Sequence, residues 1–166
     1  LLTAVYALDV SPGIMQKPWH VPQNLIRIAF DGFSLPLRDR SIDFAFSNQL
    51  IEHLHPDDAR EQLQAIYRVL KPGGKYLCIT PNRFSGPYDI SRYFDPVATG
   101  LHLREYAVFE LAGLFADAGF SRIRIILGAS RSLRLSLVPL PVMALEKLLL
   151  TLPPERAAAC ARSIPL

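Results

Sequence analysis

Two acidic residues stand where apolar segments of the chain end, and their positions suggest recognition of a nucleotide. Asp9 closes the apolar run of residues 2–8, and Asp31 closes the run of residues 25–30, with Gly32 directly after it. A carboxylate at the end of a strand can accept hydrogen bonds from both hydroxyls of a ribose. Asp31 could accept from an exocyclic amine such as that of adenine, because Gly32 lets a ligand approach the backbone closely. The alternative is that both acids are ordinary turn residues, with Asp9 capping the turn that follows it.

A second polar group follows the apolar run of residues 42–47 and could take part in proton transfer. Glu52 and His53 lie in the segment 48–54, between that run and the next helix. Histidine has an ordinary pKa that suits a general base near neutral pH, so His53 is the candidate catalytic residue. The competing interpretation is that His53 only packs its own loop.

The elements that must hold these residues follow from apolar patterning. Five apolar runs predict strands at residues 2–8, 25–30, 42–47, 75–80 and 120–127. Helices are expected at residues 13–17, 56–70, 106–118, 143–152 and 155–162, with a turn at 71–74. Alternating strands and helices predict an α/β, Rossmann-like fold, with a mostly parallel sheet and helices on both faces. Ligands bind such sheets at the carboxyl ends of the strands, which is where the two acids and the segment 48–54 belong.

The strongest helix signal begins at Pro56, which is followed by two acids that suit the first turn of a helix. Apolar residues then recur at helical spacing and predict one core-facing stripe, formed by Ala59, Leu63, Ile66, Tyr67 and Leu70.

Residues 83–105 show no periodicity, and their aromatic content favours an ordered lid over a substrate site. The candidate substrate contacts in this lid are Tyr88, Asp89, Arg92, Tyr93, His102 and Arg104. The alternative is that the aromatic residues only fix the loop to the edge of the sheet.

Residues 133–163 are expected to form a helical cap, within the single domain of residues 1–166. The charges and prolines of this segment argue against a membrane span but leave contact with a lipid or a membrane surface open.

Composition narrows the classes of partner. The chain has 166 residues, a formal net charge of +3 and a pI near 9.0, with the basic residues spread along the sequence. No cluster of Lys or Arg indicates a nucleic-acid surface, so no nucleic acid is expected.

Cys78 lies in an apolar strand pattern and is expected to be a core thiol, and the spacing to Cys160 indicates no disulfide framework. These features favour a reducing, cytoplasmic location.

Several short motifs carry a resemblance to a known family. They are residues 7–12 (Ala-Leu-Asp-Val-Ser-Pro), Asp31-Gly32 with Leu35-Pro36, Ser41-Ile42-Asp43-Phe44 leading to Ile51-Glu52-His53-Leu54, residues 67–74 (Tyr-Arg-Val-Leu-Lys-Pro-Gly-Gly) and Ala118-Gly119-Phe120. Over residues 5–127 the chain resembles the class I S-adenosylmethionine-dependent methyltransferases, and among them the methyltransferase type 11 domains. The resemblance implies methyl transfer from S-adenosyl-L-methionine to a small-molecule or lipid-like acceptor. It also implies that the cofactor is bound by Asp9 and Val10 at the ribose, by Asp31, Gly32 and Phe33 or Leu35 at the adenine, and by Asn48 and Gln49 at the methionine end.

The chain departs from the family pattern in two places. The family's first strand and its glycine-rich loop are absent, and the family's antiparallel last strand is not evident, so the domain is expected to be partial at both ends. A catalytically inactive domain that serves as a binding or scaffold module is therefore the alternative function. A nicotinamide-dependent oxidoreductase is a further rival, but it does not predict Leu35-Pro36 or the turn at residues 71–74.

The sequence Gln49-x-x-Glu52-His53 is similar to the Glu-x-x-Glu-His metal site of some members of the family. Gln49 replaces the first glutamate, and an amide is a poorer ligand for a hard cation. No metal site is expected on this ground.

Overall fold

The computed structural model describes residues 3–18, 21–32, 34–128 and 134–163. Its strands are β1 Val5–Asp9, β2 Leu25–Ala29, β3 Ile42–Asn48, β4 Leu70–Ile79, β5 Ile125–Gly128 and β6 Arg134–Leu137. Its α-helices are α1 Pro12–Met15, α2 Pro56–Val69, α3 Val108–Asp117, α4 Pro139–Leu149 and α5 Pro154–Ser163. Strands β1 to β5 and the clearest helices lie where the sequence predicts them, with ends that differ by a few residues.

The strands of the described residues form three hydrogen-bonded pairs. β1 and β2 are parallel, with Asp9 opposite Ala29, and β3 and β4 are parallel, with Asn48 opposite Ile79. β5 and β6 are antiparallel. The expectation that no antiparallel last strand would be evident is therefore wrong. β6 also occupies the beginning of the expected helical cap, so the helices of this segment start only at Pro139, and Leu133 lies outside the described residues.

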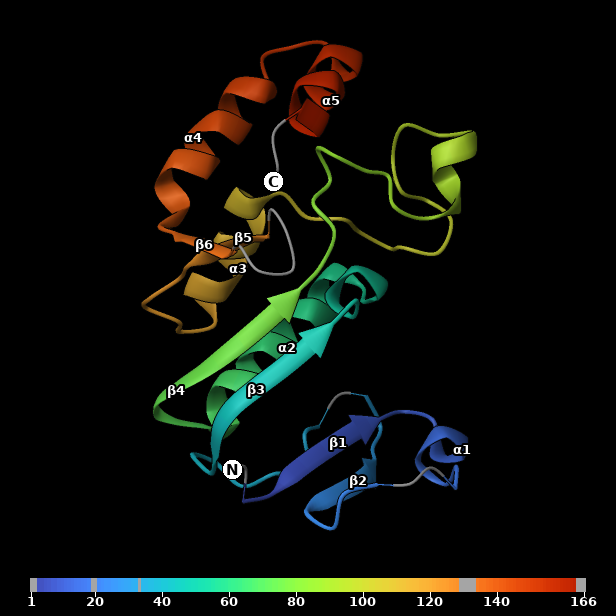
Figure 1. Ribbon diagram of the computed structural model, residues 1–166, viewed down its shortest axis with the longest axis vertical. Coiled ribbons are helices and arrows are strands. Elements are labelled where there is room, and N and C mark those ends of the chain that lie inside the picture. Colours follow the sequence, from blue (N-terminus) through green and yellow to red (C-terminus); the bar gives the residue numbers. More distant parts are fainter. Residues whose placement is uncertain (1–2, 19–20, 33, 129–133, 164–166) are drawn as a thin grey trace.

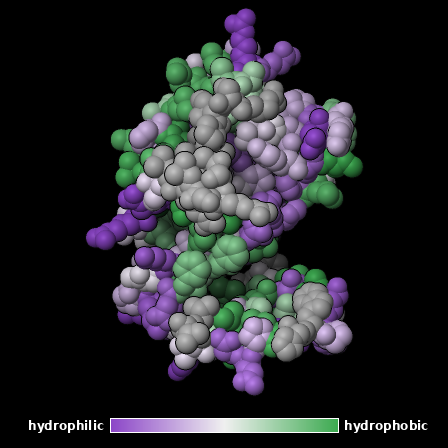
Figure 2. All heavy atoms as spheres, in the orientation of Figure 1, coloured by the Kyte–Doolittle hydropathy of each residue, from purple (hydrophilic) through white to green (hydrophobic). Residues whose placement is uncertain are grey.

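The two parallel pairs are separate, which leaves expected core residues exposed. β1, β2 and α1 lie at one end of the molecule, apart from β3 and β4 (Figure 1). The molecule narrows between these parts in the space-filling view (Figure 2). Phe44 is 51% exposed and Phe46 is 57% exposed, although an apolar run of this kind is typical of a buried strand. The apolar pattern predicts the strand correctly, but burial also depends on what covers it.

α2 provides the main core-facing stripe. His55 caps the helix by accepting from the N–H of Asp57, and Pro56 occupies the first turn, where no backbone donor is needed. The buried residues of this helix are Ala59, Leu63, Ile66 and Val69. Tyr67, which the spacing places in the stripe, is half exposed and instead packs edge-on against Phe120. The helix thus turns a slightly different face to the core than its spacing predicts.

The expected turn at residues 71–74 lies inside β4 as a bulge. The pairing of β3 with β4 passes from Ile42–Leu70 to Phe44–Lys75, so the four residues 71–74 of β4 stand opposite the single residue Asp43 of β3. Gly73 has a φ of 81°, which favours glycine, and a Cβ on Gly74 would lie 2.9 Å from the Lys71 carbonyl oxygen. The glycine pair therefore fits a β-bulge that leads directly from α2 into β4.

A buried carboxylate joins the C-terminal helices to the rest of the fold. Glu146 of α4 is fully buried, and it accepts hydrogen bonds from the Asn82 side chain and from the backbone N–H groups of Val108 and Phe109. These two N–H groups open α3, where no helical partner exists for them and where the helix dipole favours negative charge. The position of α4 thus depends on one acid at the N-terminus of α3.

We predict that Glu146→Ala destabilises the protein by about 3 kcal/mol, because it leaves buried donors without an acceptor. Urea unfolding followed by circular dichroism measures the change. Glu61→Ala on the exposed face of α2 is the matched control, and it should change stability by no more than about 0.5 kcal/mol. Equal effects of the two substitutions would contradict the role given to Glu146.

Candidate functional site

The carboxyl ends of β1 and β2 bring together four of the predicted site residues. Asp9 is the last residue of β1, and Asp31 follows the end of β2. Gly32 has a φ of 91°, and a Cβ placed on it would lie 3.1 Å from Cγ1 of Val10. Val10 and Gly32 are therefore in contact range, and the two acids lie on neighbouring parallel strands. Phe33 lies outside the described residues.

Both acids also shape the turns in which they lie. Asp9 Oδ1 accepts a hydrogen bond of 2.8 Å from the Ser11 N–H, and Asp31 Oδ1 accepts one of 2.8 Å from the Ser34 N–H. The turn interpretation of each acid is therefore correct in this structure. It does not exclude a ligand at Asp9, because a carboxylate has about four acceptor sites and this hydrogen bond uses one.

The segment after β3 holds the other predicted residues in a tight turn. Asn48 ends β3, and Gln49 has a φ of 53° while its N–H donates to the Ile79 carbonyl. Both side chains are exposed at the carboxyl edge of the β3–β4 pair. The chain then enters a 3₁₀ turn, Ile51–His53, in which Ile51 and Glu52 are fully buried.

Glu52 fixes the lid segment through its backbone. Its carbonyl oxygen accepts from the N–H groups of Leu103, at 2.8 Å, and Arg104, at 3.1 Å. The ring Nδ1 of His53 lies 3.1 Å from the Leu101 carbonyl oxygen, which adds a third link to the same segment. These contacts place His102, the residue between them, directly against Glu52 and His53.

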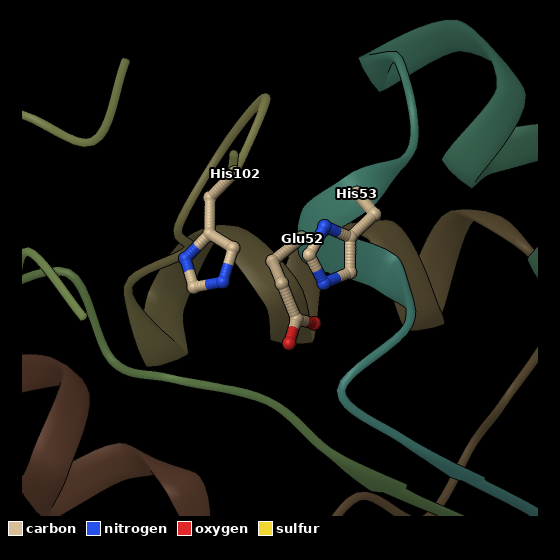
Figure 3. A group of neighbouring side chains, drawn as sticks. All are labelled: Glu52, His53 and His102. Carbon is tan, nitrogen blue, oxygen red and sulfur yellow. The ribbon is translucent and has the colours of Figure 1, made fainter. Parts of the chain in front are cut away.

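The side chains of Glu52, His53 and His102 converge (Figure 3), and each offers an atom within 4.8 Å of the others. Glu52 Oε2 accepts from the Thr80 hydroxyl at 2.8 Å, whereas the buried Oε1 has no hydrogen-bond partner. His102 is 8% exposed, and its Nδ1 lies 2.8 Å from Oε1 of Glu105. The two rings meet edge to face with centroids 4.9 Å apart. No sequence pattern predicts this grouping, since the position of His102 indicates a substrate contact of the lid.

Asp89 organises the lid from within. Its Oδ2 accepts from the backbone N–H groups of Gly100, Leu101 and His102, and its Oδ1 accepts from that of Ser91. Burial opposes ionisation of this carboxyl, but the hydrogen bonds from His102, Leu101 and Ser91 outweigh it and hold its pKa far below the usual value. Asp89 is thus occupied by the loop itself, and not oriented toward a substrate as its sequence position predicts.

An open groove of about 940 Å³ separates the lid from the C-terminal helices. Two of the predicted substrate residues, Arg92 and Tyr93, line it, with the Arg92 guanidinium 5.0 Å from the Tyr93 ring centroid. Leu149 and Leu150, from the end of α4, lie on the helical side. Tyr88 and His102 do not line the groove. Tyr88 is exposed and donates through its hydroxyl to Ser85, and His102 is buried beside Glu52.

Beneath the site, Ser47, Tyr76 and Cys78 form a half-buried polar group. The Ser47 and Tyr76 hydroxyl oxygens are 2.7 Å apart. Burial raises the pKa of the Tyr76 hydroxyl and that of the Cys78 thiol, so both stay protonated near neutral pH. Cys78 also packs against the main core, which confirms the prediction of a core thiol.

Comparison with known proteins shows that the chain is similar to methyltransferases. Residues 1–78, just under half of the chain, match the family model described as "Methyltransferase domain". A probable S-adenosylmethionine-dependent methyltransferase of Mycolicibacterium smegmatis is 40% identical over 86 residues, which cover 52% of this chain and 31% of that protein. The malonyl-[acyl-carrier protein] O-methyltransferase of Hahella chejuensis is 37% identical over 76 residues, which cover 45% of this chain and 26% of that protein. The chain thus spans less than a third of the length of either relative.

The fold agrees with solved methyltransferase structures. Human N-acetylserotonin methyltransferase, solved in complex with S-adenosylmethionine, aligns with a TM-score of 0.60 over 75% of this chain and 37% of that chain, at 19% identity. At this identity the likeness concerns the fold, which is Rossmann-like, as the sequence predicts. Among the described residues, no helix is both long enough and apolar enough to cross a membrane.

We predict that Asp89→Asn opens the lid, because the single amide oxygen of asparagine cannot accept from all four backbone donors and its NH2 group cannot accept at all. Amide hydrogen exchange should become faster at Gly100, Leu101 and His102. The control is Asp95→Asn, since Asp95 Oδ1 accepts only from the Val97 N–H among backbone donors of the same loop. Exchange at residues 100–102 should be unchanged in that variant.

The same interaction predicts a pH dependence. The pKa of Asp89 is lower in the folded protein than the unfolded value of about 3.9, so its stabilising effect is complete above that pH. The effect is lost as the pH falls toward the folded-state pKa. The difference in unfolding free energy between the wild type and Asp89→Asn should therefore be largest near pH 7 and smaller at pH 3. A constant difference across this range would show that ionisation of Asp89 is not involved.

Proposed function

We propose that this chain takes part in methyl transfer from S-adenosyl-L-methionine. It carries the sequence pattern and the fold of a class I S-adenosylmethionine-dependent methyltransferase domain. The observation that carries the proposal is the placement of Asp9 and Asp31 at the carboxyl ends of two hydrogen-bonded parallel strands. That edge is where open α/β sheets bind nucleotides.

Each predicted residue has a place in this proposal. Asp9 accepts from the ribose hydroxyls through the acceptor sites that Ser11 leaves available. Gly32 and Val10 form the surface on which the adenine lies, and the absence of a side chain at Gly32 lets the ring approach the backbone. Asn48 and Gln49, exposed after β3, face the methionine end. Phe33 is assigned to the adenine by its sequence position.

For the acceptor we propose a small molecule with an apolar chain that lies in the groove between the lid and helices α4 and α5. The groove is open and combines Tyr93, Leu149 and Leu150 with charged residues of both signs, which are Arg83, Arg92, Arg104, Asp95, Glu105 and Glu155. Apolar walls with a few charged groups suit a chain that ends in a polar head. The Hahella chejuensis relative is named for a malonyl group on acyl-carrier protein, which supports the polar head of such an acceptor and not its apolar chain.

The need for a base remains a separate proposal. Methyl transfer from a sulfonium is an in-line displacement that depends mainly on positioning and on exclusion of water. If the acceptor must lose a proton, His53 is the candidate, because its ring is exposed beside the carboxyl end of β3. A reducing, cytoplasmic setting is consistent with Cys78 and Cys160, neither of which forms a disulfide.

A binding or scaffold module without catalysis is the second candidate. The observation that favours it is that Asp9 and Asp31 both accept hydrogen bonds from their own turns, which is what purely structural acids do. Cofactor binding separates the two candidates.

We predict that the natural full-length protein binds S-adenosylhomocysteine in isothermal titration calorimetry and that Asp9→Ala weakens binding at least tenfold. Loss of hydrogen bonds to a charged acceptor costs about 1.5–3 kcal/mol, which corresponds to this factor or more. Asp43→Ala is the control, because Asp43 lies at the opposite end of the strands and only pairs with Lys71 at the surface. No binding by the wild type would favour the scaffold module, and an unchanged affinity in Asp9→Ala would refute the assignment of the ribose site.

We also predict that the groove binds 11-(dansylamino)undecanoic acid, followed by the rise in dansyl fluorescence. Leu150→Lys should weaken binding about tenfold, since it places a charge where the alkyl chain lies. Leu148→Lys is the control, because Leu148 is also exposed at the end of α4 but does not line the groove. Equal effects of the two substitutions would rule the groove out as the chain-binding surface.

A further inference from the structure

Glu52, His53 and His102 bring together a set of donor atoms that suits a metal ion. We propose that these three side chains bind one divalent transition-metal ion, of which Zn²⁺ is the best match. Two imidazoles and one carboxylate form a donor set that zinc takes in proteins, and three protein ligands leave a position for water or another oxygen. This proposal does not depend on cofactor binding, because the strand ends that carry Asp9 and Asp31 contribute no ligand.

The carboxylate of Glu52 is the first argument. Glu52 is fully buried, yet its Oε1 accepts no hydrogen bond, and an unpaired buried charge is costly. Oε2 is held by the Thr80 hydroxyl, which fixes the direction of the carboxylate. In Figure 3, Glu52 points between the two imidazoles, so a cation there would neutralise the buried charge.

The hydrogen bonds of the two histidines are the second argument. His102 Nδ1 lies 2.8 Å from a Glu105 carboxylate oxygen, and His53 Nδ1 lies 3.1 Å from the Leu101 carbonyl oxygen. Both partners are acceptors, so each Nδ1 carries the proton and each Nε2 keeps a lone pair. A histidine that donates its other ring N–H to a carboxylate or carbonyl is the usual arrangement around protein-bound zinc.

The spacing is the third argument. The three ligand atoms lie within 4.8 Å of one another. With bonds of 2.0–2.1 Å, the ligands of a tetrahedral zinc ion are about 3.4 Å apart. Small shifts of the exposed His53 side chain and of the Glu52 carboxylate can close this difference, while the backbone bonds of Glu52 to Leu103 and Arg104 keep the segments in register.

The sequence expectation of no metal rested on Gln49 in place of a glutamate. In the proposed site the third ligand is not residue 49 but His102, which belongs to the lid and which the fold brings next to Glu52 and His53. A metal ion would occupy the Nε2 lone pair of His53, so metal binding and action of His53 as a general base exclude each other.

Zinc calorimetry on the metal-free full-length protein tests the proposal. All titrations use a Cys160→Ser background, because exposed thiols bind zinc, and contain 1 mM Mg²⁺. We expect one zinc ion per chain, with affinity at least tenfold lower in Glu52→Gln, His53→Gln and His102→Gln. Glu105→Gln, which removes the partner of His102, should weaken binding by about 10- to 100-fold.

His55→Gln is the matched control, because this exposed histidine lies two positions from His53 and pairs with Asp57 outside the cluster. Its zinc affinity should stay within twofold of the wild type. Circular dichroism verifies that each variant folds, and His53→Gln, at an exposed position, tests the site if the buried variants do not fold. No zinc binding by the wild type would overturn the proposal, as would wild-type affinity in His53→Gln or an equal loss in His55→Gln. None of these outcomes depends on S-adenosylhomocysteine binding.

Discussion

The buried glutamate in the 3₁₀ turn after β3 is the constraint on which the candidate site depends. Glu52 has no exposed surface, and its backbone and side chain contact two other segments of the chain. Its carbonyl oxygen holds the lid at Leu103 and Arg104, and its carboxylate holds Thr80 at the end of β4. The ends of β3 and β4 and the lid therefore meet at one residue. A buried acid is tolerated only where such partners compensate for its desolvation.

Buried carboxylates also order the rest of this side of the molecule. Asp89 accepts from the backbone of residues 100–102, and Glu146 accepts from the first N–H groups of α3. The lid has little regular structure, and its backbone groups need partners other than a sheet or a helix. These acids supply them. The groove thus lies between the lid, which Asp89 holds in place, and α4, which Glu146 holds in place.

The sequence predicts the regular elements well and the roles of these acids poorly. Apolar runs and helical spacing locate β1 to β5, α2 and α3, because they report directly on the strand and helix periods. From the sequence, Glu146 is only a charge that argues against a membrane span. Asp89 is predicted to be a substrate contact. Glu52 and His53 are identified as polar residues after a strand, but their contact with His102 depends on the path of an aperiodic loop. Periodicity carries no information about such contacts.

The exposed faces of β3 show the same distinction between local pattern and tertiary environment. Phe44 and Phe46 have the residue types of a buried strand, and the strand forms, yet both are half exposed where β3 stands apart from β1. The carboxyl ends of both parallel pairs nevertheless carry the polar residues that the family resemblance assigns to the cofactor.

A crystal structure of the natural full-length protein with S-adenosylhomocysteine tests the central claim most directly. The account predicts that both ribose hydroxyls lie within hydrogen-bonding distance of the Asp9 carboxylate and that the adenine lies against Gly32. A ribose bound elsewhere, with Asp9 contacting only Ser11, would contradict it.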